Sequence, residues 1–128
     1  MAEGIARERY PELATYGSAG TMAVRGSAPT SPATSVAGEL GIDIGNLRAT
    51  SLSKAFTPIP DHIYVMTERH RAKVAASHPG LADRVELLDP NGDIADPYGL
   101  DTDFYRTTCD RIAAAIDLRA RQWQAEAD

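Results

Sequence analysis

The 128-residue chain contains a single cysteine, Cys109. One cysteine cannot form an internal disulfide, and it is too few for a zinc site built from several thiolates. The sequence also lacks any stretch near the ~18 apolar residues of a membrane span, and no basic segment followed by an apolar run stands at its start. These absences predict a cytoplasmic protein that makes no membrane contact and is not secreted.

Positive charge is scarce as well. There are 13 Lys and Arg residues against 18 Asp and Glu, which gives a net charge of −5, and the basic residues are scattered. A nucleic-acid-binding surface needs clustered positive charge, so nucleic acids are not expected as partners. No glycine-rich phosphate loop of the nucleotide or dinucleotide type is present, and no cofactor is predicted. At 43% hydrophobic residues, the composition is typical of a globular protein, here one domain over residues 1–128.

Strand and helix signals alternate along the chain. The N-cap of the second helix is predicted at Ser31, before Pro32, and Gly41 is its predicted stop. This alternation predicts an α/β domain with a parallel sheet. The predicted strands are residues 14–19, 62–66 and 85–88, and the predicted helices are residues 1–10, 31–40, 67–77 and 101 onward, with a single turn at 53–56.

The loop after the last predicted strand, residues 89–100, is the richest in chemistry. Ligands of parallel sheets bind beyond the carboxyl ends of the strands, and this loop carries several aspartates among prolines and glycines. Asp89, Asp93 and Asp101 fit the roles of turn and cap residues. Asp96 differs, because a carboxyl group on a proline-stiffened loop beside the ring of Tyr98 can act as a general acid. Asp96 and Tyr98 are therefore the candidate site residues.

The three histidines and the cysteine fit structural roles better than catalytic ones. His62, His70 and His78 are spaced eight residues apart, but His62 opens a predicted strand, while His70 and His78 stand at opposite ends of the next predicted helix, so the three do not converge. We therefore predict surface histidines and no metal site. Cys109 lies on the apolar face of the last helix, away from any feature that would lower its pKa, so we predict a packed side chain rather than a nucleophile.

Several segments, taken together in their order and spacing, resemble the low-molecular-weight protein tyrosine phosphatases. They are residues 1–4, 18–20, 41–43, 61–67, 87–89 and 93–99, and they span nearly the whole chain. The resemblance implies a flavodoxin-like parallel sheet with helices on both faces, whose first strand leads into a phosphate-binding loop. In the family's mechanism a cysteine of that loop attacks phosphorus, and water hydrolyses the resulting cysteinyl-phosphate.

The resemblance also assigns roles to the two candidate residues. Asp96 matches the general acid that protonates the leaving oxygen and then activates water, and Tyr98 matches an aromatic residue at the rim of the substrate cleft. The implied substrate is a phosphoprotein carrying phosphotyrosine or, as in some bacterial relatives, phosphoarginine. The family's reaction uses no metal or other cofactor.

The chain departs from the family pattern at its start. In the family the Met-Ala-Glu segment directly follows the phosphate loop, and here it is residues 1–3. We therefore expect a truncated phosphatase that lacks the central first strand, the nucleophilic cysteine and the phosphate-binding arginine, and whose 128 residues are inactive. Such a truncation could come from a start set at an internal methionine or from a true loss.

An absent central strand would leave the core incomplete. We expect the chain to be poorly stable, to pair segments 14–19 and 62–66 directly, or to borrow a strand by self-association. The alternative function is a non-catalytic interaction or regulatory module. Arsenate reductase activity on the same fold needs resolving cysteines, and only Cys109 exists.

Overall fold

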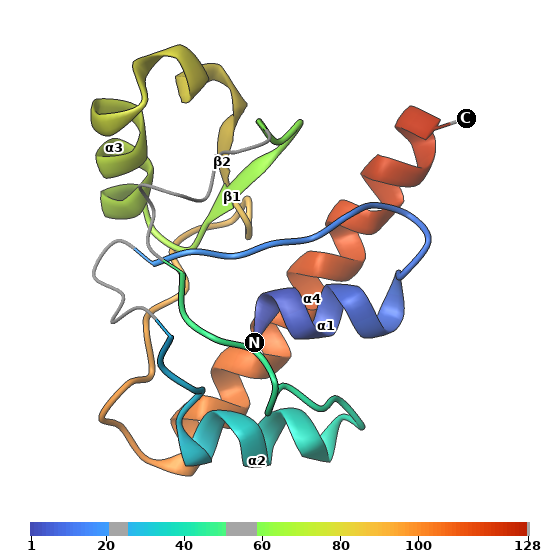
Figure 1. Cartoon of the computed structure of the whole chain (residues 1–128), viewed down its shortest axis with the longest axis vertical. Helices are drawn as coiled ribbons and strands as arrows, with labels where there is room; N and C mark the ends of the chain where they lie inside the picture. The colour runs from blue at the N-terminus through green and yellow to red at the C-terminus, as the bar shows by residue number, and fades with distance from the viewer. Residues whose placement is uncertain (21–25, 51–58, 128) are drawn as a thin grey trace.

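A computed structural model describes residues 1–20, 26–50 and 59–127 of the chain, so the helical turn predicted at 53–56 lies outside the described residues. Two strands pair in parallel, with Ile63 opposite Val85 and Val65 opposite Leu87. The structure is an α/β fold, as predicted (Figure 1). Its elements in chain order are α1 (Ala2–Arg9), α2 (Ser31–Glu39), β1 (Ile63–Val65), α3 (Glu68–Ser77), the 3-10 helix η2 (Pro79–Arg84), β2 (Val85–Leu87) and α4 (Thr102–Ala127).

Side chains alternate across β1 and face two different cores. Ile63 and Val65 pack in a small cluster with Val85 and Val74, which belongs to α3. Tyr64 points the other way and packs against the larger cluster. Helices therefore cover both faces of the sheet, with α3 on one face and the α1, α2 and α4 group on the other (Figure 1).

Helix α2 begins one residue earlier than the sequence predicts. Its N-cap is Thr30, not Ser31, because the Thr30 Oγ1 accepts the Ala33 N–H at 3.4 Å. This N–H belongs to the third helical residue, since the second, Pro32, has none. The predicted stop at Gly41 is confirmed. Gly41 adopts φ +77, and the Ile42 N–H returns to the Ala37 carbonyl at 3.0 Å, which closes the end of the helix.

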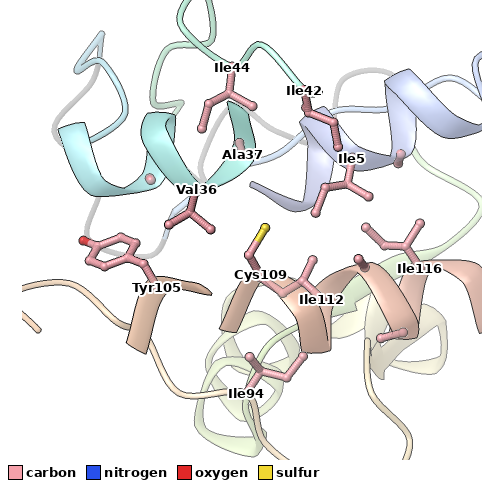
Figure 2. Close-up of a cluster of buried hydrophobic side chains, with 14 of the residues drawn as sticks. Ile5, Val36, Ala37, Ile42, Ile44, Ile94, Tyr105, Cys109, Ile112 and Ile116 are labelled. Atoms are coloured by element: carbon pink, nitrogen blue, oxygen red, sulfur yellow. The ribbon is translucent and has the colours of Figure 1, made fainter. Parts of the chain in front are cut away.

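The larger core lies where α4 meets α1 and α2. Figure 2 shows the Cys109 thiol pointing towards Val36 and Ile5, among side chains that are almost completely buried. Cys109 is 0% exposed and burial raises its pKa, so its prediction as a packed side chain is confirmed. Helix α4 is capped by Asp101, whose Oδ1 accepts the Phe104 N–H at 3.1 Å.

The prediction of a strand over residues 14–19 is wrong. The segment is extended (Figure 1), but it forms no strand. The first backbone hydrogen bond to another segment comes directly after it, where the Gly20 N–H donates to the Thr50 carbonyl at 2.9 Å. A strand needs a neighbouring backbone about 5 Å away, and no described residue provides one here. Direct pairing of this segment with β1, one of the three expected outcomes, does not occur among the described residues.

An aromatic side chain of α4 separates residues 14–19 from β1. The ring of Trp123 lies 6.0 Å from the Tyr16 ring and 5.8 Å from the Tyr64 ring, measured between centroids, and its Nε1 donates to the Tyr64 hydroxyl at 2.8 Å.

Within the described residues, no helix is both long and apolar enough to cross a membrane.

Candidate functional site

A hollow of about 190 Å³ lies beyond the carboxyl ends of both strands. The start of α1, the residue after β1, the first turn of α3, the loop after β2 and one side of α4 all contribute to it. Such a position is the usual ligand site of a parallel sheet. The lining residues are Met1, Met66, His70, Ile94, Ala95, Asp96, Pro97, Thr108 and Ile112.

Backbone and core contacts fix the loop that follows β2. The Ile94 N–H donates to the Met66 carbonyl at 2.8 Å, and the Ile94 side chain is 2% exposed. One residue earlier, the Asp93 Oδ1 accepts the Glu68 N–H at 3.0 Å at the start of α3. The loop is thus tied to the end of β1 and to α3 immediately before it reaches Asp96.

Helix α4 holds the same loop through Arg111. Its Nη2 donates to the Asp89 Oδ2 at 2.8 Å, and its Nη1 donates to the Asp93 carbonyl at 3.0 Å. The guanidinium of Arg111, followed by the N–H of Asn91, lowers the pKa of the Asp89 carboxyl below its ordinary value. Asp89 and Asp93 are therefore structural members of the loop, as the sequence predicts.

Asp96 lies in the lining of the hollow, but the Tyr98 side chain does not. The Asp96 Oδ1 accepts the Tyr98 N–H at 3.0 Å, so a local turn orients the carboxyl group. The Tyr98 side chain is 73% exposed and lies outside the hollow. The structure thus brings one of the two predicted residues to the hollow and leaves the other on the nearby surface.

His70 is a lining residue that sequence reasoning missed. The sequence predicts a surface histidine; His70 is half-buried and also lines the hollow that Asp96 lines. A signal was present, because His70 follows the helix cap Thr67, which itself follows a strand, and the Thr67 Oγ1 accepts the His70 N–H at 3.1 Å. In the part of the chain that the structure describes, no group of three or more His, Cys, Asp or Glu residues could hold a metal ion.

The other candidates lie away from the hollow. Cys109 is not among the lining residues, although its helix is one wall. The His62 Nε2 lies 3.0 Å from the Glu126 carboxylate near the far end of α4, and the His78 ring lies 3.0 Å from the Ser77 hydroxyl. Among the described residues, the lining that carries Asp96 therefore contains no cysteine.

Comparison with known proteins adds an independent result. The sequence profile described as "Low molecular weight phosphotyrosine protein phosphatase" matches residues 1–127. A protein-arginine-phosphatase from Geobacillus stearothermophilus is 32% identical over 114 residues, which are 85% of this chain and 76% of that protein. A probable low molecular weight protein-tyrosine-phosphatase, EpsP, from Ralstonia nicotianae is 29% identical over 119 residues, 91% of this chain and 81% of the relative.

Solved structures show the same similarity. The YwlE arginine phosphatase from Geobacillus stearothermophilus superposes with a TM-score of 0.91 at 28% identity, over 98% of this chain and 84% of that chain. A low molecular weight protein tyrosine phosphatase from T. tengcongensis gives a TM-score of 0.85 at 29% identity, over 94% of this chain and 88% of that one.

Proposed function

The chain belongs to the low molecular weight phosphotyrosine protein phosphatase family, and from this membership we propose that it supplies the acid–base side of a site that hydrolyses phosphoproteins. One observation carries the proposal: Asp96 lines a hollow at the carboxyl ends of both strands, on a loop held by β1, α3 and α4. Tyr98, on the surface beside it, is proposed to contact the substrate at the rim.

The proposed role of Asp96 is proton transfer. The leaving atom is the phenolic oxygen of phosphotyrosine or a guanidinium nitrogen of phosphoarginine. Protonation of that atom by a positioned carboxylic acid as its bond to phosphorus breaks accelerates cleavage by roughly 10²–10⁴-fold. The same carboxylate then takes a proton from the water that hydrolyses the phosphoenzyme. In the family's reaction that phosphoenzyme is a cysteinyl-phosphate, and Cys109 is unsuited to form it because burial raises its pKa.

The substrate is proposed as a phosphoprotein bearing phosphotyrosine or phosphoarginine. The relatives point both ways, since one is a protein-arginine-phosphatase and another a probable protein-tyrosine-phosphatase. A cytoplasmic location and a single domain over residues 1–128 remain part of the proposal. Fractionation of cells that produce the protein would test the location.

We further propose that the 128 residues alone do not turn over substrate, because their only cysteine lies in the core. Assay of the purified chain on p-nitrophenyl phosphate and on a phosphoarginine peptide should give no rate above the blank. The variants Asp96→Asn and Cys109→Ser should show the same absence of hydrolysis as the parent. A rate that either substitution abolishes would refute the proposal.

A second candidate function is a non-catalytic module that associates through β1. The Val65 carbonyl accepts the Leu88 N–H at 2.8 Å, so the Val65 backbone faces β2 and the neighbouring Tyr64 N–H and C=O point to the opposite edge. No described strand occupies that edge, and open edges accept further strands. In sedimentation between about 5 and 500 μM, the fraction of dimer should increase with the concentration of the chain. A monomer throughout this range would contradict association.

A further inference from the structure

The surface beside the hollow carries three large apolar side chains in a short stretch. Tyr98 is 73% exposed, Leu100 48% and Phe104 56%. The Leu100 N–H donates to the Pro97 carbonyl at 2.9 Å, which folds this stretch into a tight turn directly after Asp96. Figure 1 shows the loop standing out from the body of the molecule before the first turn of α4. Isolated exposed apolar residues are common, whereas clustered ones mark binding surfaces.

The same stretch is acidic. No Lys, Arg or His occurs between residues 85 and 105. Asp103 pairs at 2.6 Å with Arg106, which also pairs with Glu39, but among the described residues no ion pair involves Asp96 or Asp101. One oxygen of Asp96 accepts the Tyr98 N–H in the turn, and one oxygen of Asp101 accepts the Phe104 N–H at the start of α4. The apolar side chains are thus flanked by uncompensated negative charge.

We propose that this surface, formed by Tyr98, Leu100, Phe104 and Asp101 and called the rim surface below, binds the residues that flank the phosphorylated side chain in a protein substrate. Its charge and apolar character select flanking sequences that combine Lys or Arg with aliphatic or aromatic residues. The inference rests on the proposed function, because it names a substrate class for the same site. The apolar contacts supply affinity, and the carboxylates supply discrimination against acidic sequences.

Binding of unphosphorylated peptides to the 128-residue chain tests the rim surface without any catalysis. The probe is a peptide with a central tyrosine, leucine on both sides of it and arginine at both ends. When this peptide is titrated into ¹⁵N-labelled protein, the NMR signals of the backbone amides in residues 96–104 should shift first. A peptide with glutamate in place of each arginine should bind at least about tenfold more weakly. Higher NaCl should weaken the binding of the arginine peptide, which should still bind more tightly than the glutamate peptide.

Matched variants separate the rim surface from general effects. Phe104→Ser and Asp101→Asn should each weaken the arginine peptide by roughly threefold to tenfold. Asparagine caps helices as well as aspartate does, so Asp101→Asn removes charge and keeps the cap. The controls are Leu40→Ser, an exposed apolar residue at the end of α2, and Asp43→Asn, whose Oδ1 accepts the Gly45 N–H at 2.8 Å. Both controls should bind the peptide like the parent.

Equal binding of the arginine and glutamate peptides would overturn the inference, as would an unchanged affinity in a folded Asp101→Asn protein. Shifts at residues 96–104 that depend on protein concentration rather than on peptide would also overturn it, since a second copy would then be the occupant. The peptides carry no phosphate, so these results do not depend on the role of Asp96. Failure of the proposed acid catalysis would leave them unchanged.

Discussion

Arg111 is the residue that joins α4 to the loop in front of Asp96. It bonds to the Asp89 carboxylate and to the Asp93 carbonyl, so its removal frees both anchors at once. Arg111→Met should lower the free energy of unfolding by about 0.5–1.5 kcal/mol, near the low end because its side chain is 43% exposed. Urea unfolding measures this loss.

The control for Arg111 is Arg71→Met. Arg71 makes a looser pair with Glu68 at 3.4 Å, and both side chains are well exposed, so the free energy of unfolding should hardly change. In hydrogen exchange, the amide of Ile94 should be less protected in Arg111→Met and unaffected in Arg71→Met. An equal loss of Ile94 amide protection in the two variants would show that Arg111 does not act through this loop.

Asp89 makes the stability depend on pH in a defined direction. Arg111 and the Asn91 N–H lower the pKa of its carboxyl in the folded chain. A lowered folded pKa contributes stability above the unfolded value of about 4, and this contribution is lost as the pH falls through the folded pKa. Asp89→Asn should therefore reduce the loss of stability between pH 5 and pH 3. An identical pH profile for parent and variant, measured by urea unfolding, would contradict the assignment.

At the scale of the elements, two glycines should respond in opposite ways to the same change. A Cβ on Gly4, in α1, would collide with the γ-methyl group of Ile44, whereas a Cβ on Gly38, in α2, meets nothing within 4 Å. Gly4→Ala should destabilise the chain by about 1–3 kcal/mol. Gly38→Ala should stabilise it by up to about 1 kcal/mol, because alanine favours helix. Thermal unfolding measures both, and loss of stability in Gly38→Ala would contradict the packing of α2.

The sequence predicts elements best where a local signal suffices. Helix α3 begins after the predicted cap Thr67, and Gly41 ends the α2 region, because caps and positive φ depend on neighbouring residues only. The strand over residues 14–19 was predicted wrongly, since a strand also needs a distant partner that local pattern cannot supply. The cap at Thr30 was missed by one residue because two hydroxyl residues stand side by side there.

For the site, local pattern finds Asp96 but not its neighbours. The acidic loop is recognisable from its prolines, glycines and aspartates, so Asp96 can be selected from the sequence. His70 and Thr108 join it in the hollow only because β1, α3 and α4 meet there. The exposure of Phe104, one residue before buried Tyr105, likewise depends on how α4 packs on α2.

At the scale of the whole molecule, the hollow is a product of tertiary structure. Its walls come from segments as distant as Met1 and Ile112, and its acid belongs to the loop between β2 and α4. We propose that this arrangement makes Asp96 the general acid of a phosphatase site. A thiolate nucleophile supplied at the hollow should therefore create an activity that depends on Asp96.

The most direct measurement uses a fusion protein. A first strand and phosphate-binding loop of the family, with its cysteine, is joined to the start of this chain, and hydrolysis of phenyl phosphate is compared with that of p-nitrophenyl phosphate. We predict turnover that Asp96→Asn lowers by roughly 10²–10⁴-fold on phenyl phosphate, less on the better leaving group, with Asp93→Asn far less affected. Turnover that is the same with and without the Asp96 carboxyl would contradict the account.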